Sequence, residues 1–147
     1  MRISEPKIRG VTLKDLEAIY EIEKQSFKDP YPSNFLNLLY VANSKTFLVA
    51  ERSGVIVGYI IASADRDLGH IISIAVHPSD RRKHIGRAIM EEALNIKKSI
   101  GVTTVRLEVR QGNIDAQRFY ELLNFKKSYS LNSYYGDEDA LVYFKKL

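Results

Sequence analysis

Two segments in the second half of the chain constrain its fold most, because each predicts a strand that runs through a loop into the start of a helix. In the first, the apolar run Ile71 to Val76 predicts a strand, and apolar residues then recur at helical spacing. These later positions are Ile85, Ile89, Ala93, Ile96 and Ile100. The loop between strand and helix therefore lies at a helix N-terminus.

That helix N-terminus has the chemistry of an anion site. Its first N–H groups lack partners within the helix and the helix dipole is positive there, so a bound anion is stabilised. Gly86 and Ala88 keep the side chains small where a ligand could approach the backbone. A cluster of basic residues adds charge that suits a pyrophosphate: Arg81, Arg82, Lys83 and Arg87. The alternative is a solvated basic loop that caps an ordinary helix.

The second segment follows the same pattern. Thr103 to Val109 alternates like a strand, Asn113 is a good N-cap, and Asp115 in the first turn favours the helix dipole. One apolar helix face then carries Ala116, Phe119, Tyr120 and Leu123. Taken alone, Asn113 could merely cap the helix and Tyr120 could merely pack in the core.

Together the two segments resemble the GNAT superfamily of acetyl-CoA-dependent N-acetyltransferases. The phosphate loop of that superfamily follows Arg/Gln-x-x-Gly-x-Gly/Ala, which reads here Arg81, His84 and Gly86. The pattern Asn-x-x-Ala-x-x-x-Tyr-x-x-x-Gly-Phe, found in many members, matches at Asn113, Ala116, Tyr120 and Phe125.

Two family glycines are replaced, by His84 and Asn124. Asn tolerates a left-handed backbone, so Asn124 is a mild change. We expect His84 to point outward while its N–H still serves the ligand.

The resemblance implies one GNAT domain over residues 1–147, with a mixed, twisted α/β sheet of about seven strands flanked by about four helices. It implies acetyl-CoA (coenzyme A) as cofactor, bound partly by strand backbone where two strands splay apart. The cofactor-binding residues expected on this basis are Ile74, Ala75, Val76, Arg81, Arg82, Lys83, His84, Ile85, Gly86, Arg87, Ala88, Asn113 and Tyr120.

The remaining periodicity predicts an order of one strand, two helices, three strands, helix, strand, helix and two strands. The other strands are expected at Ile8 to Val11, Thr46 to Glu51, Val55 to Ser63, Lys126 to Leu131 and Ala140 to Phe144. The first helix is capped by Thr12 and is broken before Ser33, where a shorter helix begins and runs to about Ala42. The apolar positions of the first helix are Leu13, Leu16, Ile19, Tyr20, Ile22 and Phe27. Turns are expected at Ser53-Gly54 and at Asp65 to Gly69, and Gly101 ends the long helix.

Within the superfamily, three places are most similar to ribosomal-protein alanine N-acetyltransferases and to archaeal and eukaryotic protein N-terminal acetyltransferases. They are the helix and loop Ile22 to Tyr31, the strand Leu107 to Arg110, and the tyrosine-bearing segment Ser133 to Ala140. This resemblance implies transfer to the α-amine of protein N-termini. Five residues would shape the slot for the acceptor peptide: Phe27, Pro30, Tyr31, Tyr134 and Tyr135.

The chemistry needs a base for the acceptor amine and an acid for the leaving thiolate. Glu108, on an alternating strand beside the expected cofactor site, is the candidate base, acting through water. A protein α-amine has a pKa near ~7.8 against ~10.4 for lysine, a difference of about 3.5 kcal/mol that suits a modest base. Tyr120 is the candidate acid by resemblance, and an N–H near Val76 would polarise the carbonyl. Alternatively, Glu108 is a surface carboxylate paired with Arg106 or Arg110.

Composition narrows the remaining classes. The 147 residues are 45% hydrophobic, enough for one core, and contain no cysteine, so transfer would be direct and no thiolate metal site exists. His70 and His77 should face opposite ways on one strand, so no metal is expected. No apolar run is long enough to span a bilayer, which favours a cytoplasmic protein.

The partners expected are protein or peptide N-termini, including ribosomal proteins or nascent chains, with a monomer or homodimer as the oligomeric state. The net charge of +4 fits a phosphorylated cofactor as well as nucleic acid, which stays a minor alternative. Two other functions remain open: a small-molecule amine acetyltransferase and a non-catalytic acyl-CoA-binding sensor.

Overall fold

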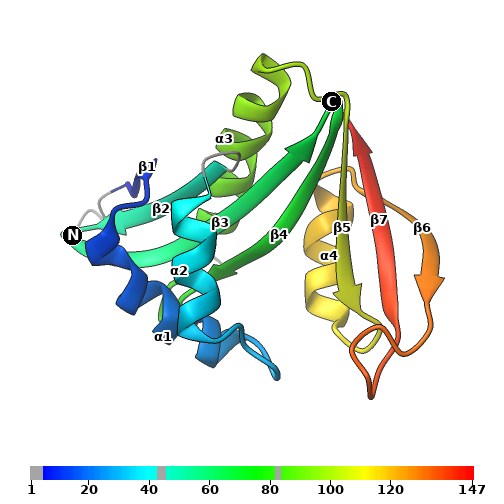
Figure 1. The fold of residues 1–147 in the computed structure, drawn as a ribbon, viewed down its shortest axis with the longest axis horizontal. Helices are drawn as coiled ribbons and strands as arrows, with labels where there is room; N and C mark the ends of the chain where they lie inside the picture. The colour runs from blue at the N-terminus through cyan, green and yellow to red at the C-terminus, as the bar shows by residue number, and fades with distance from the viewer. Residues whose placement is uncertain (1–4, 43–45, 82–83) are drawn as a thin grey trace.

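A seven-stranded sheet with the order β1-β2-β3-β4-β5-β7-β6 forms the centre of the computed structural model, which describes residues 5–42, 46–81 and 84–147 (Figure 1). Every neighbouring pair is antiparallel except β4 and β5, which are parallel. The strands are β1 Lys7–Gly10, β2 Thr46–Arg52, β3 Val55–Asp65, β4 Leu68–Val76, β5 Thr104–Arg110, β6 Lys126–Leu131 and β7 Ala140–Lys146.

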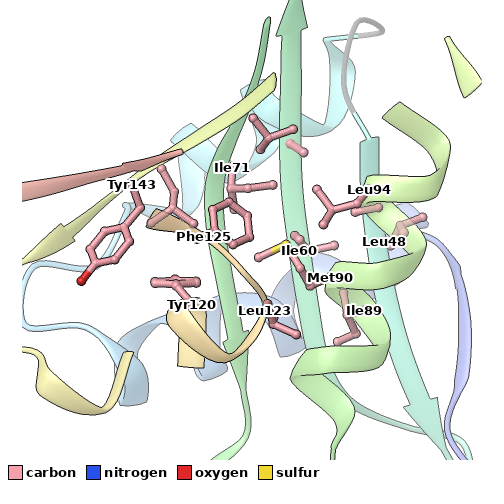
Figure 2. Packing of buried hydrophobic residues seen from close by; sticks show 14 of the residues in the cluster. Leu48, Ile60, Ile71, Ile89, Met90, Leu94, Tyr120, Leu123, Phe125 and Tyr143 are labelled. Atoms are coloured by element: carbon pink, nitrogen blue, oxygen red, sulfur yellow. The ribbon is translucent and has the colours of Figure 1, made fainter. Parts of the chain in front are cut away.

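Helices cover both faces of the sheet. They are α1 Leu16–Ser26, α2 Ser33–Val41, α3 Ile85–Ser99 and α4 Ile114–Leu122, with 3-10 turns at Leu13–Asp15 and Pro78–Asp80. Side chains of β3 alternate between the faces, because Tyr59 and Ile61 join the core under α1 and α2 while Ile60 and Ala62 join the core under α3 and α4. Figure 2 shows the second of these cores, in which α4 contributes Tyr120.

The sheet opens between β4 and β5. Their parallel pairing covers only Leu68↔Thr104, Gly69↔Val105 and His70↔Arg106, and among the described residues no later part of β4 pairs with β5. Figure 1 shows the two strands diverging from this point. Gly69 allows the close approach, since a Cβ there would lie 3.0 Å from Cγ2 of Val105. The splay that the resemblance implied is therefore present, and it leaves one backbone edge of β4 without a strand neighbour.

The expected fold class and element order are confirmed, with small differences at the ends of elements. The first helix begins as a 3-10 turn, because Thr12 and Asp15 form a capping box. The turn expected over Asp65 to Gly69 is shorter, since β3 extends to Asp65 and β4 begins at Leu68. No helix of the described part of the chain is long and apolar enough to cross a membrane.

Two expected apolar positions are wrong. Leu13 lies in the 3-10 turn before α1 and is 66% exposed. Ile100 was placed on the apolar stripe of the long helix, but it is the C-cap of α3 and 64% exposed. The chain leaves the helix there and turns through Gly101 at a φ of 97°. Lys97 instead lies on the buried face and is 2% exposed.

Candidate active site

The splay and the N-terminus of α3 lie at the same end of β4. From Ile74 to Val76, β4 pairs with β3 on one side only, so the backbone groups along its other edge face the opening between β4 and β5. These groups and the first N–H groups of α3 are suited to a ligand with an amide-containing arm and phosphates. The residues present therefore fit coenzyme A at this site.

The loop before α3 has the backbone that a glycine normally supplies. His84 is the N-cap of α3, is exposed, and has a φ of 62°. This left-handed conformation explains why glycine is common at that position in the motif that the loop resembles. Asn124, the other replaced glycine, has a φ of 68°, as its tolerance of this region predicted.

Arg81 is held against the protein rather than being a mobile charge as expected. Its Nε donates to the carbonyl of Val76 at 2.9 Å and its Nη2 donates to Oγ of Ser26 at 3.0 Å. Arg87 also has a partner, since its Nε lies 2.8 Å from Oε1 of Glu91. Arg82 and Lys83 lie outside the described residues.

The start of α3 packs tightly on α4. A Cβ on Gly86 would lie 3.2 Å from Cζ of Phe119, so the small residue that the loop pattern contains is also required by packing. Ile85 is buried in the core beneath it, and Ala88 is half-buried. The backbone of this turn is thereby fixed in place.

On α4, Asn113 and Tyr120 both make structural contacts. Oδ1 of Asn113 accepts the N–H of Ala116 at 3.2 Å, so Asn113 caps the helix. The ring of Tyr120 contacts those of Phe119, Phe125 and Tyr143 at centroid distances of 5.4, 5.9 and 6.4 Å. Burial raises the pKa of Tyr120, so its hydroxyl is protonated at neutral pH.

Glu108 lies at the centre of a hydrogen-bonded group where β5 leaves β4. Oε1 lies 2.8 Å from Nε2 of His70 and accepts the hydroxyl of Tyr134 at 3.4 Å, while Oε2 accepts Nη1 of Arg106 at 2.9 Å. Its side chain is 7% exposed, so it is not a surface carboxylate. Burial would raise the pKa of Glu108, but His70 and Arg106 outweigh it and the pKa is lowered.

Pairing of Glu108 with Arg106 was predicted as the alternative to a catalytic role. The contact of Glu108 with His70 was not predicted, because the sequence suggested His70 only as a possible metal ligand. The strand register explains the contact with His70. His70 pairs with Arg106 across the parallel strands, so its imidazole lies beside Glu108, two residues further along β5. His77 lies beyond the end of β4 and caps the following 3-10 turn. Within the described chain, no three His, Asp or Glu side chains are grouped to hold a metal ion.

Two loops lie at the end of the sheet where β4 and β5 are furthest apart (Figure 1): the acceptor loop, residues 27–32 between α1 and α2, and the hairpin loop, residues 132–139 between β6 and β7. Tyr134 and Tyr135 of the hairpin loop contact each other edge to face at 4.9 Å. Burial raises the pKa of Tyr31, and Glu23, Tyr134 and Glu108 raise it further, so Tyr31 lies within electrostatic reach of Glu108. The tyrosines expected to form the slot are thus brought together.

Pro30 and Phe27 have less direct roles. Phe27 ends α1 and packs against the core under α1 and α2. Pro30 is half-buried within the acceptor loop.

The buried carboxylate of Glu23 anchors the acceptor loop. The sequence predicts no role for Glu23, which was named only as part of the segment Ile22 to Tyr31. Glu23 on α1 is 2% exposed, and its Oε2 accepts the backbone N–H of Tyr31 at 3.0 Å. Its Oε1 accepts the hydroxyls of Tyr59 and of Ser73, the latter at 3.2 Å. Because Ser73 lies on β4 next to Ile74, one side chain connects the acceptor loop with the edge of the splay.

The chain was compared with known protein families and proteins. Residues 16–125 match the family model described as Acetyltransferase (GNAT) family. A curated relative, an uncharacterized N-acetyltransferase from Methanocaldococcus jannaschii, is 40% identical over 141 residues, covering 95% of this chain and 90% of the relative.

Two further proteins share the whole length. An N-alpha-acetyltransferase from Sulfurisphaera tokodaii is 33% identical over 152 residues, covering 94% of this chain and 91% of the relative. Among solved structures, Ard1 from Thermoplasma volcanium superposes with a TM-score of 0.93 at 30% identity, covering 98% of this chain and 99% of that one.

Proposed function

Because this chain belongs to the GNAT acetyltransferase family and is an acetyl-CoA-dependent N-acetyltransferase, we propose that it acetylates the α-amine of protein N-termini. The observation that carries the proposal is the position of Glu108, between His70 at the splay and Tyr134 of the hairpin loop. The similarity to an N-alpha-acetyltransferase supports it. Ribosomal proteins and nascent chains are the candidate acceptors.

Bound acetyl-CoA supplies an activated acetyl thioester. The backbone of Ile74, Ala75 and Val76 would hold its amide-containing arm at the open edge of β4. The N-terminus of α3, from His84 to Ala88, would face its phosphates, with Arg82 and Lys83 as further candidates. A backbone N–H near Val76 would polarise the acetyl carbonyl, which is the usual electrostatic contribution to acyl transfer.

Glu108 would act as a proton acceptor through water. Its lowered pKa means that complete proton transfer from an α-amine of pKa ~7.8 to a carboxylate of ordinary pKa ~4.3 costs at least about 5 kcal/mol. Release of the same proton to water at pH 7 costs about 1 kcal/mol. The carboxylate therefore works best by orienting a water molecule, and His70, whose side chain is 26% exposed, connects it to solvent.

Tyr120 would donate a proton to the leaving thiolate. Ordinary phenol and thiol pKa values of ~10 and ~8.5 already make this transfer uphill by about 2 kcal/mol. Burial raises the pKa of Tyr120, so the step costs more in this environment than the ordinary values predict. Contacts of the thiolate with the helix dipole or backbone N–H groups would have to reduce this cost.

A polyamine substrate finds little support. Such a cation needs free carboxylates, but four acidic residues beside the slot already have basic partners. Glu108 binds His70 and Arg106, and Asp29, Asp137 and Glu138 all bind Arg110.

The experiment that tests the proposal measures thiol release from acetyl-CoA with three acceptor sets: peptides that differ in their first two residues, lysine peptides with blocked N-termini, and spermidine. We expect turnover only with free N-termini. Turnover only with spermidine would move the assignment to a small-molecule acetyltransferase, and cofactor binding without turnover would indicate a sensor.

A further inference from the structure

Arg110, the last residue of β5, joins the acceptor loop to the hairpin loop. Its Nη2 lies 2.7 Å from Oδ2 of Asp29 in the acceptor loop. Its Nη1 lies 3.2 Å from Oδ1 of Asp137 and 3.1 Å from Oε1 of Glu138 in the hairpin loop. The guanidinium also lies over the ring of Tyr135, 4.3 Å from the centroid. One side chain thus holds both loops at once.

A second ion pair closes the same gap. Nζ of Lys28 in the acceptor loop pairs with Oδ2 of Asp137, which Arg110 also binds. Lys28 and Arg110 together lower the pKa of Asp137 to about 2. Asp137 is therefore ionised across the whole pH range in which an α-amine loses its proton.

The hairpin loop is fixed to the end of β5 by close backbone contacts. Oε2 of Glu138 accepts the N–H of Gly112 at 2.6 Å, and a Cβ on Gly112 would lie 2.7 Å from the same oxygen. The N–H of Gln111 donates to the carbonyl of Asp139 at 3.0 Å. Arg110 therefore extends from a rigid base toward the acceptor loop.

The two ends of the acceptor loop are held differently. Tyr31 is anchored by the buried carboxylate of Glu23, which solvent does not reach. Lys28 and Asp29 are held by ion pairs, and their side chains are 64% and 68% exposed. Salt screens exposed pairs much more than buried ones. Only the ion-paired end of this loop can therefore loosen with ionic strength.

We propose that Arg110 is a positioning residue for acetyl transfer, and that its ion pairs with Asp29, Asp137 and Glu138, together with the Lys28 pair, form a salt-sensitive clasp that sets the width of the acceptor slot. The clasp rests on the proposed function for its effect on catalysis. It acts on acceptor binding, because all its members lie on the two loops and at the end of β5.

The kinetic test uses Asp29→Asn, an exposed substitution that removes one ion pair while keeping the size of the side chain. Since exposed pairs are worth up to about 1 kcal/mol, the acceptor KM should rise about two- to fivefold, with kcat and the Kd for acetyl-CoA unchanged. The KM of the natural protein should rise between 50 and 500 mM NaCl more steeply than that of Asp29→Asn. Glu21→Gln, which removes the exposed pair of Glu21 with Lys24 on α1, is the matched control and should leave KM unchanged.

Arg110 itself is tested by a conservative pair. Arg110→Lys keeps the charge and loses the planar fork, so its acceptor KM should lie between those of the natural protein and Arg110→Gln. A loss of acetyl-CoA binding in step with the rise in KM would show a general structural role and would overturn the clasp.

A second readout does not need turnover. In Asp29→Asn, hydrogen exchange should become faster in residues 132–139, which lie in the other loop. Unchanged exchange there, or an unchanged acceptor KM, overturns the clasp. Absence of turnover with every peptide overturns the proposed function, and hydrogen exchange then decides the clasp independently.

Discussion

At the scale of single residues, the two candidate catalytic side chains are placed by different forces, and each can be tested against a neighbour of the same kind. Tyr120 is held by ring contacts, so Tyr120→Phe keeps its packing and removes only the hydroxyl. We expect kcat to fall at least tenfold, about 1.4 kcal/mol of barrier, with the Kd for acetyl-CoA nearly unchanged.

Tyr143→Phe is the control, because Tyr143 lies in the same aromatic cluster and its hydroxyl donates to Glu121 at 2.8 Å, away from the site. Its kcat should match that of the natural protein. Equal kcat values for Tyr120→Phe and Tyr143→Phe would remove Tyr120 from proton transfer.

Glu108 gives a prediction about pH. His70 and Arg106 hold its pKa below the ordinary value of about 4.3, so the carboxylate is fully ionised above pH ~6. Because an α-amine of pKa ~7.8 is mostly protonated at pH 6 and mostly neutral at pH 9, Glu108→Gln should lower kcat/KM most at pH 6 and progressively less toward pH 9. Initial rates measured over this pH range test the prediction. Glu51→Gln serves as control, because it alters a carboxylate of β2 that is paired with Arg9 of β1. A deficit that stays the same from pH 6 to pH 9 would contradict a role in taking the proton of the acceptor ammonium.

At the scale of elements, the acceptor loop depends on one buried carboxylate on α1. The two carboxylate oxygens of Glu23 accept three hydrogen bonds. In Glu23→Gln an NH2 group replaces one of these oxygens, and it cannot accept the hydrogen bonds that this oxygen accepted. A buried donor left unpaired costs about 1–3 kcal/mol, so the free energy of unfolding should fall by about that amount.

Urea unfolding measures this loss, with Glu17→Gln on the exposed face of α1 as control. Faster hydrogen exchange in residues 27–32 should accompany it. A variant as stable as the control would mean that the loop is held by its other contacts.

At the scale of the whole molecule, the two parts of the sheet are joined between β4 and β5 by only three residue pairs. A ligand in the splay would contact both parts and stabilise the folded chain. Acetyl-CoA at one hundred times its Kd should add about 2.7 kcal/mol to the free energy of unfolding, seen as a rise in Tm of roughly 5–10 °C. Adenosine, which lacks the pantetheine arm, should shift Tm much less. No shift with saturating acetyl-CoA would place the cofactor elsewhere.

Periodicity and capping residues determined the elements themselves, because burial of one face and local hydrogen bonds depend on neighbours in the sequence. The strand before the basic loop, the cap at Asn113 and the left-handed Asn124 could all be read in this way. The motifs at Arg81 to Ala88 and Asn113 to Phe125 indicated the family, and the match over residues 16–125 confirmed it.

Only the tertiary structure decided which side chains meet across long separations. His70 reaches Glu108 through the register of two parallel strands, Glu23 reaches Tyr31 across a loop, and Arg110 reaches Asp29 from the far end of β5. Local sequence patterns do not predict the contact of His70 with Glu108, since it depends on how far β4 and β5 run together before they separate. The sequence by itself thus determined the elements and the family, whereas the position of the splay determined that His70 of β4 meets Glu108 of β5.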